Sequence, residues 1–448
     1  MPISPARAAA FDILLRVEQT DAYASELLHS ALAAKLSPQD HRFATELVMG
    51  VLRWKPALDA EIARFSSQQI KNLDVEVLVA MRLAAYQFSH LERIPAWAAV
   101  HESVELVRRA RKRSAAPFVN AVLRKLAETT AENTVRSGER LDRIEEGHES
   151  LAGEFAHPAW LVERWVEKFG LETARQICQF NQTTPETTIH CASSEAEREL
   201  REDGVEVVAG KLLASARRVE SGDVTKSRAF REGRVFIQDE GSQLVALLAG
   251  KGARILDCCA APGGKTRLLA SRNPDSEIVA VELHPHRARL LQKLVPARNV
   301  RVVTADIHNF PLVQKFDLVL ADVPCSGTGT LARNPEIKWR LKPEDLADLQ
   351  ARQLAILGAA MRHVTLGGRL VYSTCSLEHE ENSEVVNKVL AGDSSFQLRD
   401  CGVELQQLRL DGELCWNNPG SLVSSNYLRT VPGVHPCDGF FAAVLRKS

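Results

Sequence analysis

The sequence predicts a multidomain protein with an all-α N-terminal domain, a small α+β middle module and a C-terminal α/β domain. Three observations predict this fold class. The 448 residues exceed what one hydrophobic core usually supports. Apolar residues recur every three to four positions through the first third of the chain. After Gly233, apolar β-type segments alternate with helical stretches, which is typical of a parallel sheet covered on both faces.

The composition is that of an ordinary globular protein, with 45% hydrophobic and 25% charged residues. The formal net charge is -1, so any nucleic-acid partner must be held by local patches of charge. Nine scattered cysteines without a CxxC pair predict reduced thiols and no metal site. The chain shows neither a long uncharged apolar stretch nor a signal-peptide pattern, which predicts a cytoplasmic protein with no membrane partner. We also expect a monomer.

Residues 1–130 are predicted to form the helical domain, because residues such as Phe11 and Leu14 follow helical spacing. Residues 131–150 are polar and predict a linker. Residues 151–235 combine a helix at Trp160–Phe169 with short β-type pieces and predict the small module. Residues 236–448 then form the α/β domain.

A run of cations in the helical domain leaves two interpretations open. Such a run is usually the solvated face of a helix, and it can also contact phosphate groups. Its members are Arg108, Arg109, Arg111, Lys112 and Arg113.

The α/β domain contains five predicted strands, and polar residues follow the point where most of them end. The carboxyl edge of an open parallel sheet is where ligands bind. We therefore expect a site at this edge. The predicted strands are Arg254–Asp257, Ile278–Leu283, Val300–Asp306, Phe316–Asp322 and Arg369–Ser373.

The first strand leads into a turn of small residues that opens a helix, Cys258-Cys259-Ala260-Ala261-Pro262-Gly263-Gly264-Lys265-Thr266. Small residues let the backbone approach a ligand, and a helix start offers unpaired N–H donors. A phosphate-binding loop needs glycine where Cys259 stands, and a GxGxxG dinucleotide pattern is missing. A ligand with adenosine but no phosphate remains, and S-adenosylmethionine satisfies that description.

Three acidic residues at the following strand ends extend this predicted cofactor site. Glu282 lies 25 positions after Asp257, close to the spacing at which an acid accepts ribose hydroxyls. Asp306 is placed to reach an adenine amino group. Asp322 ends the fourth strand.

Two cysteines lie at neighbouring strand ends beside this site, Cys325 in the segment DVPCSGTG and Cys375 in YSTCS. Carbon 5 of cytosine is a poor nucleophile until a thiolate adds to carbon 6, and such covalent catalysis divides one difficult step into easier ones. A protonated acid near ring N3, for which Asp322 is placed, stabilises the adduct. An amino-directed methyltransferase usually carries an Asn-Pro-Pro-Tyr type of loop instead. These arguments leave the roles of the two thiols open.

At these motifs the chain resembles the RNA 5-methylcytosine methyltransferases of the RsmB/Sun/Fmu (Nop2/Sun) family. The segments DCCAAPGGKT, DVPCSGTG, NPEIKW, YSTCS and the closing DGFF carry the resemblance. The first third, including SPARAAAFDILLRVE and TELVMGVLRW, resembles a NusB-like RNA-binding domain. Together they cover nearly the whole chain and imply a Rossmann-like class I methyltransferase domain at the C-terminus.

The resemblance implies a role for each matching residue. Cys375 would be the nucleophile, and Cys325 would assist product release. The substrate would be a cytosine of 16S ribosomal RNA, which Arg333, Lys338, Trp339 and Arg340 could grip by phosphate contact or stacking. The alternative is a non-catalytic RNA-binding assembly factor, which needs neither thiol. S-adenosylmethionine would be held by Cys259, Ala260, Ala261, Pro262, Gly263, Gly264, Lys265, Glu282, Asp306 and Asp322.

Overall fold

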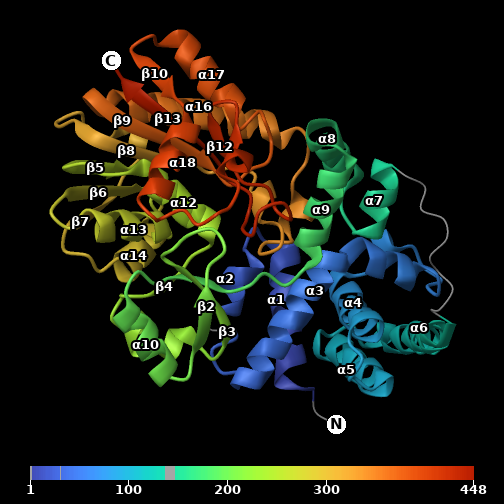
Figure 1. Cartoon of the computed structure of the whole chain (residues 1–448). Coiled ribbons are helices and arrows are strands. Elements are labelled where there is room, and N and C mark those ends of the chain that lie inside the picture. Colours follow the sequence, from blue (N-terminus) through green and yellow to red (C-terminus); the bar gives the residue numbers. More distant parts are fainter. Residues whose placement is uncertain (1–2, 31, 137–146) are drawn as a thin grey trace. The chain divides into compact units, whose positions relative to one another are not determined.

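The computed structural model describes residues 3–30, 32–136 and 147–448 (Figure 1). The chain divides into two compact units. The helical unit comprises Met1–Thr183 and the separate segment Leu331–Arg340, and the sheet unit comprises Thr184–Thr330 and Leu341–Ser448. Within the described ranges, no helix has both the length and the apolar character needed to cross a membrane.

The helical unit confirms the predicted all-α start of the chain. Apolar side chains from α1, α3, α4, α5 and α6 form its core, and Ile13, Leu47 and Val107 are fully buried there. Ser37 caps α3 by accepting a hydrogen bond from the amide of Asp40, and Pro38 follows as its first residue. Its helices are α1 (Pro5–Gln19), α2 (Ala24–Leu28), α3 (Pro38–Ala63), α4 (Val75–His90), α5 (Ala96–Arg109), α6 (Ala116–Arg136), α7 (His148–Glu154), α8 (Ala159–Phe169), α9 (Leu171–Gln182) and α15 (Ile337–Arg340), with 3-10 turns η1 (Ile70–Asn72) and η2 (Arg113–Ala115).

The predicted linker at 131–150 overlaps a helix at each of its ends. Helix α6 continues to Arg136, and α7 begins at His148. Residues 137–146 lie outside the described part of the chain. A polar composition with little apolar periodicity predicts a linker, but it does not exclude helical residues at the ends of that linker.

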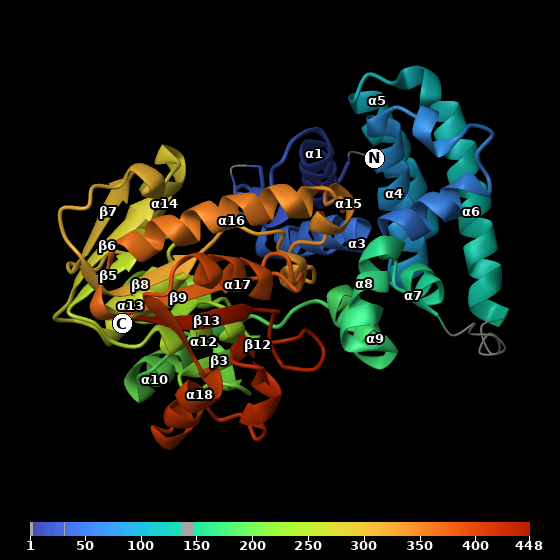
Figure 2. The ribbon, with the colours of Figure 1, turned by 90° about the horizontal axis from the view of Figure 1, so that it is seen from above.

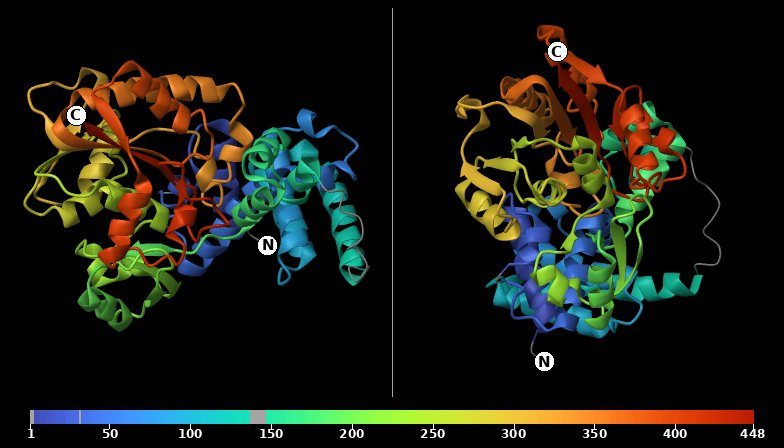
Figure 3. Two further views of the ribbon diagram at one scale, coloured as in Figure 1. Left: turned by 45° about the horizontal axis from the view of Figure 1, so that its top comes forward. Right: turned by 60° about the vertical axis from the view of Figure 1, so that its left-hand side comes forward.

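The predicted middle module is divided between the two units. Helices α8 and α9 group with the helical unit, whereas the small β-sheet groups with the sheet unit. This sheet has the antiparallel order β2-β3-β1-β4. Its core contains Ile189 and Val207 from the strands and Leu200 from α10, which is drawn in green in Figure 3. Its elements are β1 (Thr188–His190), α10 (Ser194–Glu202), β2 (Glu206–Ala209), β3 (Ala216–Ser221), η3 (Val224–Lys226), α11 (Arg228–Arg231) and β4 (Phe236–Ile237).

The large sheet has nine strands in the order β11-β12-β13-β9-β8-β5-β6-β7, with β10 paired to β13. The five predicted strands are present and run parallel, from β7 to β9. The remaining four are antiparallel additions beyond β9, which the sequence analysis did not predict. The strands are β5 (Arg254–Asp257), β6 (Glu277–Glu282), β7 (Val300–Thr304), β8 (Phe316–Asp322), β9 (Val364–Thr374), β10 (Phe396–Arg399), β11 (Val423–Ser424), β12 (Tyr427–Arg429) and β13 (Phe441–Lys447).

Helices cover both faces of the large sheet (Figure 2). Alternate residues of one strand face opposite layers, so Leu320 packs in the layer of α12, α13 and α18, and Val319 packs in the layer of α16 and α17. This confirms the predicted α/β domain. The helices are α12 (Glu240–Ala249), α13 (Gly264–Arg272), α14 (Pro285–Leu294), α16 (Asp345–Arg362), α17 (Ser383–Gly392) and α18 (Cys401–Leu410), with 3-10 turns η4 (Ile307–Asn309), η5 (Thr328–Thr330) and η6 (Pro419–Leu422).

Candidate active site

The carboxyl ends of the parallel strands bring most of the predicted site residues to one edge of the sheet. In the strand register, Asp257 of β5 is opposite Ala280 of β6, and Asp322 of β8 is opposite Ser373 of β9. Glu282 is the last residue of β6. Side chains that follow these positions therefore meet at the same edge.

The turn after β5 has a shape that only small residues allow. Gly263 has φ +116°, and a Cβ at this position would lie 2.6 Å from Val295 Cγ2. The next residue, Gly264, begins α13. Thr266 Oγ1 donates to Asp257 Oδ2 at 2.7 Å and so fastens α13 to the end of β5. Burial raises the pKa of Asp257 to about 7.

Glu282 and Asp306 each accept one hydrogen bond from a nearby backbone amide. Glu282 Oε1 accepts from the amide of His284 at 2.9 Å, and the residue is 4% exposed. Asp306 Oδ1 accepts from the amide of His308 at 2.9 Å, and its side chain is 39% exposed. Carboxylates accept hydrogen bonds from the hydroxyl and amino groups of an adenosine. The residues present therefore fit S-adenosylmethionine.

Lys265 and Asp322 form an ion pair beside this turn. Lys265 Nζ lies 2.8 Å from Asp322 Oδ2, and Ser373 Oγ donates to Asp322 Oδ1 at 2.7 Å. Burial lowers the pKa of the Lys265 ammonium, but the charges of Asp322 and Cys375 outweigh it, so its pKa is raised. Lys265 is thus a positive charge close to the thiols.

The thiol sulfurs of Cys325 and Cys375 lie 3.4 Å apart. The hydrogen bond with Cys375 and burial both raise the pKa of Cys325 well above the ordinary value of a thiol. Cys325 therefore stays protonated at neutral pH. Burial likewise raises the pKa of Cys258 and of Cys259, which favours an inert packing role for both thiols.

Sequence reasoning missed several polar residues of this edge. Ser373 contacts Asp322, Thr266 contacts Asp257, and Glu381 contacts both cysteine loops. Ser373 and Thr266 belong to the segments YSTCS and GGKT, so their position in those motifs was a usable signal. Glu381 stands in the run EHEEN, where no spacing distinguishes it from the neighbouring acids.

Lys338 and Arg340, which were predicted to contact RNA, make hydrogen bonds within the helical unit, and the burial of Lys338 disfavours a contact with RNA. Lys338 is 1% exposed, and its ammonium donates to the carbonyls of Arg53 and Ala156, both at 3.0 Å. Arg340 donates to the carbonyl of Val17 at 2.6 Å. Val17 lies in the last turn of α1. Both side chains stabilise the helical unit from the segment Leu331–Arg340.

Other residues of the same segment also bond within the helical unit. Trp339 Nε1 donates to the carbonyl of Leu52 at 2.6 Å, and Glu336 accepts from the amide of Ala24 at 2.7 Å. Trp339 therefore has a structural contact within the helical unit.

Much of the charge of the cationic run is balanced by acids within the helical unit. Arg108 pairs with Glu105, Arg109 with Asp12 and Lys112 with Asp74. Arg111 and Arg113 are exposed, and within the described ranges no ion pair joins either of them to an acid.

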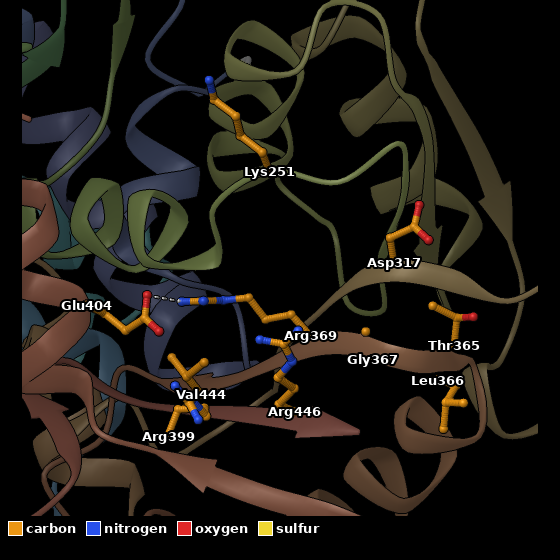
Figure 4. A pocket seen from close by; sticks show the side chains of 11 residues that line it. Lys251, Asp317, Thr365, Leu366, Gly367, Arg369, Arg399, Glu404, Val444 and Arg446 are labelled. Atoms are coloured by element: carbon orange, nitrogen blue, oxygen red, sulfur yellow. Dashed lines mark ion pairs between the residues drawn. The ribbon is translucent and has the colours of Figure 1, made fainter. Parts of the chain in front are cut away.

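A cavity of about 370 Å³ lies at the opposite edge of the large sheet and contains none of the predicted site residues (Figure 4). Lys251, Asp317 and Gly367 line it near the amino ends of the parallel strands. Arg369 pairs there with Glu404 at 3.1 Å. Over the described residues, no group of three or more His, Cys, Asp or Glu side chains is arranged to hold a metal ion.

Three family profiles match the chain. Residues 244–446 match the family described as 16S rRNA methyltransferase RsmB/F, and residues 4–128 match the NusB family. Residues 157–225 match the ferredoxin-like domain of RsmF/B-like methyltransferases. The NusB match confirms the predicted NusB-like character of the helical domain.

Individual relatives agree with these matches. The chain is 33% identical to the probable ribosomal RNA small subunit methyltransferase B of Bacillus subtilis, over 98% of each chain. It is 31% identical to ribosomal RNA small subunit methyltransferase B of Vibrio cholerae, over 98% of this chain and 97% of that one. The solved structure of PH0851 shares the fold, with a TM-score of 0.76, 23% identity and full coverage of both chains. The chain belongs to the 16S rRNA methyltransferase RsmB/F family, and it is a methyltransferase that depends on S-adenosylmethionine.

Proposed function

We propose that this protein methylates carbon 5 of a cytosine in 16S ribosomal RNA, and that the cytosine is C967. The observation that carries the proposal is the 3.4 Å approach of the Cys325 and Cys375 sulfurs beside the Lys265–Asp322 pair. A scaffold that only bound RNA needs neither thiol. The relatives named as small subunit methyltransferases support a ribosomal RNA substrate, which implies action in the cytoplasm.

In the proposed reaction, the Cys375 thiolate adds to carbon 6 of the cytosine and makes carbon 5 electron-rich. S-adenosylmethionine, held by the turn after β5 with Glu282 and Asp306, supplies an activated methyl group. Asp322 is placed to contact ring N3 and so to stabilise the adduct that the addition creates. After the methyl transfer a base removes the carbon 5 proton, and Cys375 then leaves.

The electrostatics favour Cys375 as the nucleophile and Cys325 as its partner. The raised pKa of Cys325 keeps this thiol protonated, so that it donates toward Cys375. Lys265 provides a positive charge near a Cys375 thiolate. Since Cys325 retains its proton, it suits a later step, in which it assists release of the methylated product.

Trapping of the protein–RNA adduct tests this proposal. With S-adenosylmethionine and 16S RNA, Cys375→Ala should neither methylate the RNA nor form an adduct. Cys325→Ala should accumulate a protein–RNA adduct that survives denaturation. Cys415→Ala is the matched control, because Cys415 is exposed and stands outside the site. An adduct in Cys375→Ala rather than in Cys325→Ala would reverse the two roles, and full methylation by Cys375→Ala would exclude the covalent mechanism.

The position of the methyl group in the RNA is a separate measurement. Bisulfite sequencing of 16S ribosomal RNA should show one protected cytosine, C967, that loses its protection in a deletion strain. Protection that stays unchanged would assign the protein to the non-catalytic alternative or to another nucleotide.

A further inference from the structure

The residues that directly follow the two cysteines share one buried carboxylate. Ser326 and Ser376 both donate their hydroxyl hydrogens to Glu381 Oε2. The amide of Ser326 also donates to Glu381 Oε1, at 2.8 Å. Glu381 is 0% exposed. One side chain thus joins the loop after β8 to the loop after β9.

Further hydrogen bonds fix this carboxylate and the chain on either side of it. Gln353 Nε2 donates to Glu381 Oε1 at 2.8 Å and to the carbonyl of Pro324, which precedes Cys325, at 3.0 Å. The Tyr372 hydroxyl donates to the backbone carbonyl of Glu381 at 2.6 Å. With the two serines, the carboxylate receives four hydrogen bonds, which is the full capacity of an ionised carboxylate.

We propose that Glu381 is a positioning residue that sets the separation of the Cys325 and Cys375 thiols. It does not contact either sulfur, and it acts by holding the residue that follows each cysteine. Displacing a reacting group by about 1 Å costs on the order of 100-fold in rate, so a fixed separation matters for catalysis. This inference deepens the proposed function and rests on it.

Glu240 provides a matched control for a merely structural role. It is 1% exposed, belongs to the same unit and accepts hydrogen bonds from the amides of Lys211, Leu212 and Leu213. Burial raises the pKa of both carboxyl groups. Replacing Glu240 therefore removes an equally buried carboxylate without touching either cysteine loop.

The first test measures the thiol pair itself, without RNA. Phenylarsine oxide forms As–S bonds to two adjacent thiols and releases one water, so its affinity for the full-length protein reports whether two sulfurs are held close together. Mass spectrometry gives the bound fraction, and Cys325→Ala gives the background from other thiols. Glu381→Ala should weaken binding by about tenfold or more, because the pair is no longer preorganised. Glu240→Ala should bind as the natural sequence does, and equal affinities in Glu381→Ala and Glu240→Ala overturn the proposal.

The second test measures chemistry in the Cys325→Ala background. Adding Glu381→Ala should slow adduct formation by about 100-fold, while the affinity for S-adenosylmethionine changes less than about twofold. Glu381→Gln should recover most of the rate, since its oxygen accepts from Ser326 and Gln353 while its amide donates to the serine hydroxyls. An unchanged rate in the doubly substituted protein would contradict the proposal.

The two tests separate this inference from the proposed function. If Cys325→Ala forms no adduct at all, the covalent mechanism fails, and arsenical binding still decides whether Glu381 positions the thiols. If Glu381→Ala does not fold, Ser326→Ala and Ser376→Ala replace it, because each removes one hydroxyl contact and keeps the buried carboxylate. Each should weaken arsenical binding, and unchanged binding in both would overturn the proposal.

Discussion

The Lys265 ammonium donates to Asp322 Oδ2 at 2.8 Å and joins the helix after β5 to the end of β8. The same nitrogen lies 4.9 Å from the centroid of the Phe440 ring. The raised pKa keeps Lys265 charged at neutral pH, although its side chain is only 12% exposed. The site therefore holds one fixed positive charge next to two thiols and a carboxylate.

Lys265→Met should lower the rate of methyl transfer by about 100-fold, since it removes a preorganised charge from the site. Lys251→Met is the control, because Lys251 lines the cavity at the opposite edge of the sheet. Transfer of a labelled methyl group to RNA measures both rates, and the KM for RNA shows whether binding changes as well. Equal rates in the two variants would remove Lys265 from the mechanism.

The buried carboxyl of Asp257 should make the stability of the sheet unit depend on pH. Its pKa is about 7 in the folded protein and 3.8 as an ordinary value, so the folded state retains a proton that the unfolded state releases. The stability that this proton contributes is complete below pH 3.8 and is lost as pH rises to about 7. The difference between the two pKa values of Asp257 corresponds to about 4 kcal/mol of stability.

Asp257→Asn isolates this effect, because asparagine does not titrate and its oxygen still accepts from Thr266. Urea unfolding of both proteins at a series of pH values should show the natural sequence losing stability relative to the variant between pH 4 and about pH 7. Parallel pH profiles for the two proteins would mean that Asp257 has an ordinary pKa.

Lys338→Met should destabilise the helical unit by about 1–3 kcal/mol, because the carbonyls of Arg53 and Ala156 lose their donor. Thermal unfolding measures this loss. Affinity for RNA, measured against salt concentration, should keep its slope, since the buried ammonium meets no phosphate. A slope reduced by about one would return Lys338 to the RNA-binding set.

We expect the cationic run to bind RNA mainly through Arg111 and Arg113. Among the described residues, neither of them forms an ion pair with an acid. The double substitution Arg111→Gln and Arg113→Gln should reduce the slope of log affinity for RNA against log salt concentration by about two, because two phosphate contacts are lost. Arg108→Gln with Arg109→Gln is the control, because both arginines already pair with acids. Equal effects in the two pairs would show that these ion pairs open on binding, and no effect in either would assign the run to a solvated face.

The sequence by itself determined the helical domain, the five parallel strands and the edge of the sheet at which the predicted site residues gather. Apolar spacing predicted the helical domain and the five parallel strands, because both patterns are local properties of consecutive residues. The small-residue turn and the acids at the strand ends predicted the cofactor edge, since parallel strands end together. The strands β10 to β13 were missed, because no rule of spacing ties them to the parallel core.

Only the tertiary structure decided how individual side chains are used. Lys338 is a lysine in a polar segment, and its burial depends on Arg53 and Ala156, which lie 285 and 182 positions away. Glu381 has the same side chain as its neighbour Glu380, and only the structure shows that it accepts hydrogen bonds from Ser326 and Ser376. Periodicity reports what neighbours along the chain do, whereas burial and hydrogen bonding of a polar group depend on residues that only folding brings near it.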